Sequence, residues 1–468
     1  MRVTFVGHAS LLIETRGLRI LSDPWWKGPC FGGQWWLYPE PISDLVSAAP
    51  IDYIYISHGH HDHFHPVTLR TLPRTSRVLV SKQPELSRAI SELGFPVVEL
   101  SGDEQLALGN GVSCRILPTH SDDTMMIITD GVETCLDIND ALHATSTPMR
   151  RHFTRVLRGL VPSLDYVFCA YGIASHFPNC YRVPGKDPVE TAIQRQRHFN
   201  RAWSEIINAL SPRLAFPFAA DVVFLEDDLF WSNEPIHNAE RPTDVFTTRY
   251  PASSTAVVDI APGFTVEGGR ILRNSVRAPV SNVRLKHVYG EALQRVNEYR
   301  PVAPERIQAL VTLLTDNIGT CHEYLAAFPN DYQCLIRLRG AAEAICVVKN
   351  GSSIVVNRTP EPVPFKGAYD LIYTTRASYL TQSLTTEYGH ETLFVGSGGL
   401  FEYTRASRPT APIHRELMLI MTRTTVCPTR PAAGLRRRLA LAKTCAKRLI
   451  GRADEDLYDL ERWMAVAR

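Results

Sequence analysis

IDYIYISHGHHDH, at residues 51–63, is the most informative stretch of this sequence. Its first seven residues form an apolar run that predicts a buried strand. Four residues of ligand type then fall within six positions, namely His58, His60, Asp62 and His63. Neutral imidazole and carboxylate groups on one tight turn suit Zn(II) or Fe(II). We therefore expect a metal site at the end of this strand, in preference to a solvated histidine-rich loop.

The H-x-H-x-D-H pattern of this stretch resembles the metallo-β-lactamase superfamily. The resemblance implies an α/β fold, the αββα sandwich, with metal ligands on loops at strand ends. Two later strand ends follow in the superfamily's order, which implies His120 as the third histidine of the first metal site and Asp140 as the metal-bridging aspartate. A structural histidine and a helix cap are the alternatives. Asp137 is less favoured than Asp140, because alternation along its strand points it differently from its neighbours.

The superfamily pattern also asks for a last histidine near residues 213–221, where none occurs. Asp221 is one replacement, because a carboxylate is an acceptable ligand of Fe(II) or Zn(II). The alternative is that a second metal is absent. His176 and His237 are further candidates, for which we expect a position beside the site or at the surface. This departure argues against two-metal hydrolysis of the usual form.

The opening segments FVGHASLLIE (residues 5–14) and LRILSDPWW (residues 18–26) resemble the paired first strands of one superfamily branch. That branch contains ascorbate-phosphate lactonases and phospholipid-cleaving enzymes. The resemblance implies that His8 and Asp23 lie near the metal, and we assign the catalytic roles to Asp62 and His8. The alternatives are a packed strand-end histidine and, since Pro24 follows it, an Asx turn at Asp23.

The residues expected to contact a substrate are Trp25, Trp26, His176, Tyr181 and Arg182. The tryptophans can line an apolar or sugar-stacking surface, and Tyr181 and Arg182 can meet an anionic group. A tryptophan-rich core loop is the alternative for Trp25 and Trp26. The sequence therefore indicates a small-molecule substrate without naming it.

The composition is that of an ordinary globular protein, with 468 residues, 44% hydrophobic and 21% charged. A net charge of +2 does not favour nucleic acid, and no apolar run is long enough to span a bilayer. Ten cysteines occur without a C-x-x-C pair, which is typical of a reducing compartment. The chain starts directly with a predicted strand, so we expect no secretory signal and a cytoplasmic location.

The chain length predicts two domains and a tail. Residues 1–280 alternate strands and helices and form the expected metal-binding catalytic domain. Residues 290–425 read as a small α+β domain that weakly resembles a sterol-carrier-like fold. Residues 430–468 carry arginines and lysines among apolar residues and predict a basic amphipathic helix. We favour packing of this helix on its own domain over peripheral contact with an anionic membrane or docking of an acidic redox partner.

Four segments resemble the metal domain of CMP-N-acetylneuraminate hydroxylases, at residues 57–69, 177–181, 212–219 and 262–265. Those enzymes also lack the last histidine. They carry a Rieske domain, whereas this sequence has no C-x-H pair with a later C-x-x-H and hence no Rieske ligands. Any electrons would therefore come from a separate redox donor protein.

Two hypotheses follow, and each uses one or two metal ions. In the favoured one the protein is an iron-dependent oxygenase or hydroxylase that acts on a small polar or nucleotide-sugar-like metabolite. One iron would be bound by His58, His60 and His120. A second would be held by Asp62, His63 and Asp140, with Asp221 as a further ligand. In the alternative, zinc or manganese hydrolyses an ester, lactone, amide or phosphodiester, with metal-activated water oriented by Asp62. A purely structural metal is least favoured, because structural zinc sites are closed cages of four ligands.

Overall fold

The structure is a computed structural model that describes residues 1–102, 104–119, 123–172, 177–320, 328–351, 353–360, 368–386, 389–404 and 420–422. Its contacts divide the chain into two compact units. The first comprises residues 1–173, 193–223 and 234–281, and the second takes the described residues of the remaining segments. The short segments 177–192 and 224–233 thus pack with the second unit. The domains expected at 1–280 and 290–425 stay predictions, and the expected basic tail lies outside the described residues.

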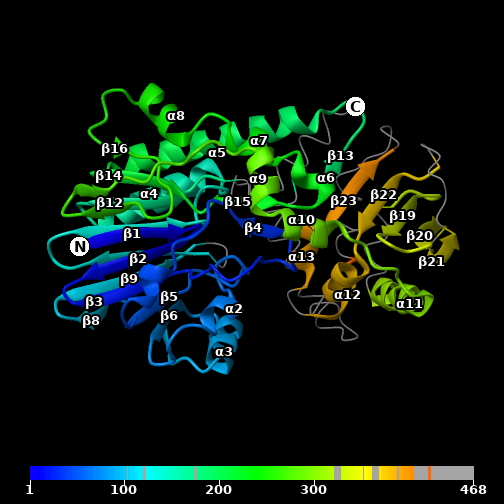
Figure 1. Cartoon of the computed structure of the whole chain (residues 1–468), viewed down its shortest axis with the longest axis horizontal. Coiled ribbons are helices and arrows are strands. Elements are labelled where there is room, and N and C mark those ends of the chain that lie inside the picture. Colours follow the sequence, from blue (N-terminus) through cyan, green and yellow to red (C-terminus); the bar gives the residue numbers. More distant parts are fainter. Residues whose placement is uncertain are drawn as a thin grey trace. The chain divides into compact units, whose positions relative to one another are not determined.

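Two sheets make up the centre of the first unit (Figure 1). The first sheet has the order β18 (Arg270–Arg273), β17 (Thr265–Glu267), β1 (Arg2–Gly7), β2 (Ser10–Thr15), β3 (Leu18–Ser22), β5 (Tyr53–Tyr55), β6 (Arg77–Ser81) and β7 (Val97–Leu100). The second has the order β16 (Ala256–Val257), β14 (Leu214–Phe218), β12 (Tyr166–Ala170), β11 (Thr134–Asn139), β10 (Thr124–Thr129), β9 (Val112–Pro118) and β8 (Leu106–Gly109). The short strands β4 (Trp35–Leu37) and β15 (Val222–Phe224) lie outside both sheets.

Alternation along the strands creates one core between the sheets and one on each outer face. On β1, Phe5 belongs to the core between the sheets, whereas the next residue, Val6, belongs to the outer core of the first sheet. On β11, Cys135 faces the first sheet and Leu136 joins the outer core of the second. Successive side chains of a strand point to opposite faces, so strands buried on both faces must be apolar throughout.

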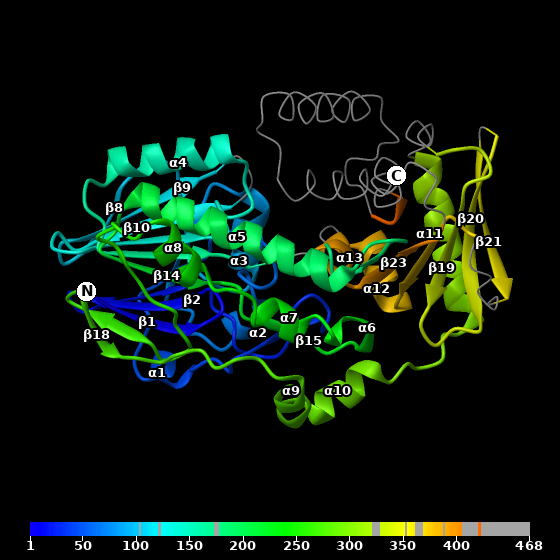
Figure 2. The ribbon, with the colours of Figure 1, turned by 90° about the horizontal axis from the view of Figure 1, so that it is seen from above.

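Helices cover both outer faces. The first sheet packs against the region of α2 (Pro66–Leu69) and α3 (Pro84–Glu92), with α1 (Asp44–Ser47) nearby in the chain. The second packs against α4 (Thr147–Leu160), α5 (Pro188–Leu210) and α8 (Pro242–Arg249), as Figure 2 shows. The predicted αββα sandwich is therefore confirmed.

The second unit is built on a six-stranded sheet of mixed direction. Its order is β13 (Tyr181–Arg182), β23 (Gly399–Tyr403), β22 (Leu371–Thr375), β19 (Gln333–Leu338), β20 (Glu343–Asn350) and β21 (Ser353–Pro360). The remaining helices are α6 (Asp227–Phe230), α7 (Asn233–His237), α9 (Asn282–Val288), α10 (Gly290–Asn297), α11 (Pro304–Thr320), α12 (Ala377–Thr385) and α13 (His390–Phe394). Within the part of the chain that the structure describes, no helix combines the length and the apolar character needed to cross a membrane.

Candidate metal centre

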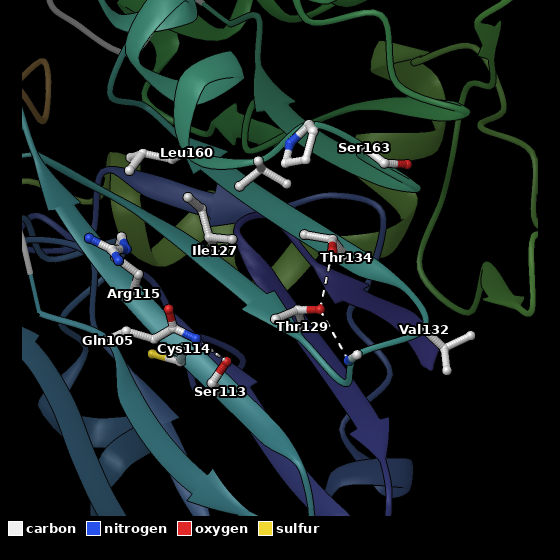
Figure 3. Close-up of a pocket in the computed structure, with 13 residues that line it drawn as sticks. Gln105, Ser113, Cys114, Arg115, Ile127, Thr129, Val132, Thr134, Leu160 and Ser163 are labelled. Atoms are coloured by element: carbon white, nitrogen blue, oxygen red, sulfur yellow. Dashed lines mark hydrogen bonds between the residues drawn. The ribbon is translucent and has the colours of Figure 1, made fainter.

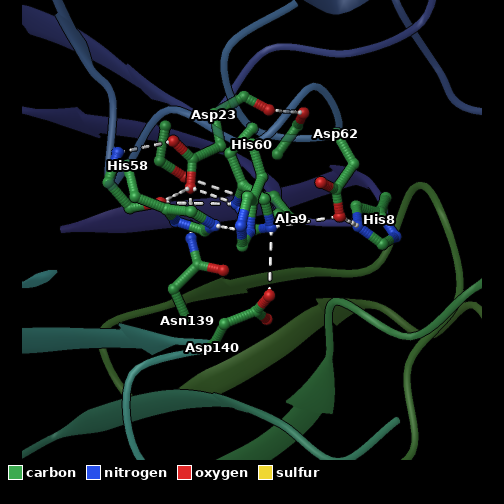
Figure 4. Close-up of polar contacts among 12 residues, drawn as sticks. His8, Ala9, Asp23, His58, His60, Asp62, Asn139 and Asp140 are labelled. Atoms are coloured by element: carbon green, nitrogen blue, oxygen red, sulfur yellow. Dashed lines mark hydrogen bonds and ion pairs between the residues drawn. The ribbon is translucent and has the colours of Figure 1, made fainter. Parts of the chain in front are cut away.

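The metal motif lies where several strands of the sandwich end. The motif follows β5, His8 follows β1, Asp23 follows β3, and Asp140 follows β11. The backbone turns into the left-handed region at His8 (φ 48°), Asp23 (φ 37°) and Asn139 (φ 52°). Residues other than glycine seldom adopt this conformation, and such residues cluster at functional sites. These turns bring polar side chains from four strand ends together (Figure 4).

Asp23 is the most richly bonded carboxylate of this cluster, and it is fully buried. Its Oδ1 accepts the backbone N–H of Ser57 at 2.8 Å, and its Oδ2 accepts the hydroxyl of Ser57 at 2.7 Å. The same Oδ2 lies 3.0 Å from Nδ1 of His63 and also accepts an N–H of Asn139. A carboxylate on one ring nitrogen fixes the tautomer and leaves the other nitrogen as a ligand. Asp23 therefore directs Nε2 of His63 into the cluster.

Nε2 of His63 points at two carboxylates. It lies 3.2 Å from Oδ2 of Asp62 and 3.2 Å from Oδ2 of Asp140. Burial opposes protonation of His63, but the carboxylates of Asp62, Asp140 and Asp23 together raise its pKa well above the usual value. Against the effect of burial, His63 and His8 hold the pKa of Asp62 well below its usual value. The two carboxylates that face Nε2 of His63 therefore favour a positive charge at this position.

A metal ion can supply this positive charge. One oxygen each of Asp62 and Asp140, and Nδ1 of His8, are buried without a hydrogen-bond partner within the described residues. Buried polar groups are nearly always partnered, so each such atom calls for an explanation. Ligand atoms of His8, Asp62 and His63 lie within 4.8 Å of one another, as do those of His58, His63 and Asp140. Both groups combine imidazole and carboxylate, the donors that suit iron or zinc.

A third group lies beside these two and joins His58, His60 and Asp123. Nε2 of His58 is 2.8 Å from Nδ1 of His60 and 3.7 Å from Oδ1 of Asp123. Burial, and then the neighbouring His63, lower the pKa of His58 to about 4, so its ring is neutral and able to bind a metal. Sequence reasoning missed Asp123. The available signal was its place just before β10, next to the expected ligand His120, which lies outside the described residues.

His8 completes the buried part of the centre. Its Nε2 lies 3.1 Å from Oδ2 of Asp62, and it is 2% exposed. Trp25 packs edge-on against the His8 ring, with centroids 5.1 Å apart, and donates its indole N–H to Gly28 at 2.8 Å. Trp25 is fully buried, and Trp26 is half-buried. Trp25 therefore packs beside His8, and a substrate-binding role for either tryptophan stays a prediction.

Other expected site residues lie in none of the three groups. Oδ1 of Asp221 forms an ion pair of 3.0 Å with Arg277, so its role as a metal ligand stays a prediction. Tyr181 is buried and stacks on Phe401 in the second unit. Arg182 donates to backbone carbonyls, among them that of Asn179 at 2.9 Å. The substrate contacts of Tyr181 and Arg182 stay predictions, and His176 lies outside the described residues.

Comparison with known proteins agrees with this geometry. Residues 2–124 match the model of the family described as the Beta-lactamase superfamily domain. This part of the chain is similar to that family. The predicted resemblance to the superfamily is therefore confirmed, and the matched segment contains His8, Asp23 and the whole histidine motif.

Two groups of curated relatives align with this chain. A protein of Mycolicibacterium smegmatis, provisionally named a Rieske 2Fe-2S iron-sulfur protein, is 29% identical over 49% of this chain and 45% of its own length. The cytidine monophosphate-N-acetylneuraminic acid hydroxylase of Cricetulus griseus is 29% identical over 47% of this chain and 40% of its own. That of Asterias rubens is 31% identical over 29% of this chain and 20% of its own. The chain thus spans about half the length, or less, of these relatives.

Solved structures with a similar fold include CmlA, named a diiron beta-hydroxylase from Streptomyces venezuelae. It is 22% identical and covers 58% of this chain and 54% of its own, with a TM-score of 0.38. The metallo-beta-lactamase fold protein YhfI from Bacillus subtilis is 14% identical and covers 57% of this chain and 99% of its own, with a TM-score of 0.37.

Proposed function

We propose that this chain is an iron-dependent oxygenase that hydroxylates a small molecule with electrons from a separate protein. The observation that carries the proposal is the alignment of about half the chain with relatives named as hydroxylases and as Rieske iron-sulfur proteins. Both names denote redox chemistry, because a Rieske cluster carries electrons. The imidazole and carboxylate groups of the centre are suitable iron ligands and support the same conclusion.

The centre offers ligands for two metal ions. One set is His58, His60 and Asp123. The sequence analysis predicts His120 as a further ligand of this set. The other set is His63 with Asp62 and Asp140, and Nε2 of His63 is aimed at both carboxylates. When bound, iron at these positions supplies the one-electron chemistry that O₂ activation needs.

The residues around the ligands have separate tasks in this proposal. Asp23 holds the proton of His63 on Nδ1 and so keeps Nε2 available. His8 donates from Nε2 to Asp62 in this arrangement, which keeps that carboxylate ionised and oriented. Nδ1 of His8 is buried and has no hydrogen-bond partner among the described residues, so it is open to a group bound at the centre. Trp25 excludes water from this side of the centre.

Electrons must come from outside the printed sequence. The sequence contains no C-x-H pair and therefore no Rieske ligand set. The relative from Mycolicibacterium smegmatis, by contrast, is named a Rieske iron-sulfur protein. We infer a separate electron-transfer protein as the partner. The substrate class remains a small polar or nucleotide-sugar-like metabolite, a proposal that rests on the names of the hydroxylase relatives alone.

Hydrolysis by zinc or manganese is the second candidate, and one observation favours it. Asp62 is an ionised, buried carboxylate held by His8, and such a group can orient a metal-activated water. The same ligand types also form hydrolytic zinc sites.

Metal analysis of anaerobically purified protein tests the two candidates. We expect one to two irons per chain and consumption of O₂ after chemical reduction, with both lost in His60→Ala. An exposed histidine on α4 gives the matched control, and His152→Ala should retain full iron and O₂ consumption. Zinc alone, unchanged when iron is supplied during expression, would overturn the oxygenase and leave the hydrolase. Full metal content in His60→Ala would show that His60 is not a ligand.

A further inference from the structure

Helix α4 carries a charge pattern that the fold does not require. Its sequence TPMRRHFTRVLRGL contains four arginines and no acidic residue. Arg150 is buried and donates to the carbonyl of Thr145. Arg151, Arg155 and Arg158 are exposed. Their spacing places them on one side of the helix, three or four residues apart. None of these three forms an ion pair within the described part of the chain.

This row of arginines is costly to the helix itself. Like charges three or four residues apart on a helix repel one another and destabilise it. On α5, which packs on the same face of the second sheet, Arg197 and Arg201 repeat the spacing and are exposed. Figure 2 shows the two helices side by side on this face. By contrast, α3 on the other side of the sandwich mixes both signs of charge, as a solvated helix usually does.

A hollow of about 350 Å³ lies at the C-terminal end of α4. Leu160 and Val161 line it from the helix side, and Ser113, Arg115 and Ile127 line it from the sheet, as Figure 3 shows for the labelled residues. Exposed apolar side chains surround this end of the helix, with Val132 75% exposed, Leu160 40% and Val156 37%. Exposed apolar side chains with arginines beside them are a composition found in protein–protein interfaces, where arginine is enriched and lysine depleted.

The same helix is joined directly to the metal centre. Asp140 is separated from the first residue of α4, Thr147, by a short loop. Within this loop, Nδ1 of His143 lies 2.9 Å from the carbonyl of Asp140. Arg150 fixes the first turn of the helix to the carbonyl of Thr145. Since α4 has 14 residues, its far end lies about 21 Å along the helix axis from that loop. A protein docked along α4 therefore reaches the segment that carries Asp140 only at the first turn of the helix, and the hollow lies at the far end.

We propose that the outer face of α4, with the hollow at its C-terminal end, docks an acidic electron-transfer protein. The proposal rests on the function proposed above, which requires an external electron donor. Arginine pairs with carboxylates in bidentate geometry, so a row of three selects an acidic protein surface. An anionic membrane fits less well, because the exposed apolar residues named here include no tryptophan or phenylalanine. Opposite charge on the two partners also speeds their encounter.

Charge reversal tests the docking surface. The variant Arg151→Glu/Arg155→Glu/Arg158→Glu changes the net charge by −6, as does the control Arg70→Glu/Lys82→Glu/Arg88→Glu at exposed positions on the other side of the sandwich. The probe is an acidic [2Fe–2S] ferredoxin, and its dissociation constant is measured by calorimetry at low and high salt. We expect at least tenfold weaker binding for the α4 variant and less than a twofold change for the control. Salt should weaken the wild-type complex.

Equal weakening in both variants would overturn the proposal, because net charge alone would then explain binding. Absence of ferredoxin binding, together with α4-dependent binding to phosphatidylserine vesicles, would replace the protein partner with a membrane surface. The binding measurement needs no substrate and no turnover, so its failure leaves the oxygenase proposal intact. The protein could also contain only zinc and still bind ferredoxin through α4. That result would support α4 as a docking surface for an acidic protein but would contradict its role in electron transfer.

Discussion

At the scale of single residues, the centre depends on carboxylates that differ in task. Asp23 accepts hydrogen bonds from Ser57, His63 and Asn139, and its charge is shared among these donors. Asp62 and Asp140 instead keep an oxygen without a partner in the described structure. A fully bonded carboxylate orients its neighbours, whereas one with free lone pairs can bind a cation.

Asp23→Asn should therefore weaken metal binding without replacing a ligand. The amide keeps the shape of the side chain but places an N–H₂ or a single neutral oxygen against donors that need a carboxylate. Loss of such an orienting partner typically costs 10–100-fold in metal affinity. Chelator competition measures the change. Asp52→Asn is the control, because the side chain of the exposed Asp52 accepts only from the backbone of Arg19 among the contacts described. Unchanged affinity in Asp23→Asn would remove its orienting role.

At the scale of elements, the loops that follow the neighbouring parallel strands β12 and β14 lie in direct contact. β12 and β14 pair in parallel register from Tyr166 to Ala170, and each then turns at the edge where the metal centre lies. Gly172 follows β12 and Ala220 follows β14. A Cβ added to Gly172 would lie 2.3 Å from Cβ of Ala220 and 3.0 Å from its Cα. Only glycine allows the two strand ends to meet in this way.

Gly172→Ala should lower the free energy of unfolding of the first unit by about 1–3 kcal/mol, because backbone and side chain must shift to admit the methyl group. Gly159→Ala is the matched control. It lies within α4, where an added Cβ meets no atom within 4 Å, and alanine favours the helix by roughly 0.5–1 kcal/mol. Denaturant unfolding followed by circular dichroism measures both changes. Equal effects of the two substitutions would contradict the close contact with Ala220.

At the scale of the whole molecule, we expect a metal bound at this centre to contribute to the stability of the first unit. The centre joins strand ends of both sheets, and His63 lies between the buried carboxylates of Asp62 and Asp140. A ligand that binds only the folded state stabilises it by an amount set by its concentration and affinity. We therefore expect a metal held by these side chains to link the two halves of the sandwich.

Removal of the metal with a chelator should lower the temperature of the thermal transition of the first unit, and added metal should restore it. Metal at about 100 times its dissociation constant contributes about 2.7 kcal/mol. Differential scanning calorimetry gives the shift. In His60→Ala the chelator should have little effect, and a shift as large as in the wild type would contradict the assignment of His60.

Local sequence was sufficient for the buried strands and for the motif, and the resemblance of that motif to a known superfamily implied the sandwich. Continuous apolar runs predict strands buried on both faces, and the strand before His58 is one of them. The spacing of histidines and aspartate within six residues places them on one turn whatever the rest of the fold. These features depend on neighbours in the chain, so they can be predicted without tertiary structure.

The family resemblance implied that His8, Asp23 and Asp140 lie near the motif, but their actual contacts were decided only in three dimensions. Asp23 and His8 contact His63 and Asp62 because β1, β3 and β5 end at one edge of one sheet. Asp123, which precedes β10 of the second sheet, lies close to His58 because the two sheets pack face to face. The sequence analysis missed this residue. Asp221 has the right chemistry for a ligand yet pairs with Arg277, since its neighbours in space, and not its position in the sequence, determine which charge it meets. Periodicity along a strand specifies a face, whereas the distance between strand ends depends on the packing of the two sheets.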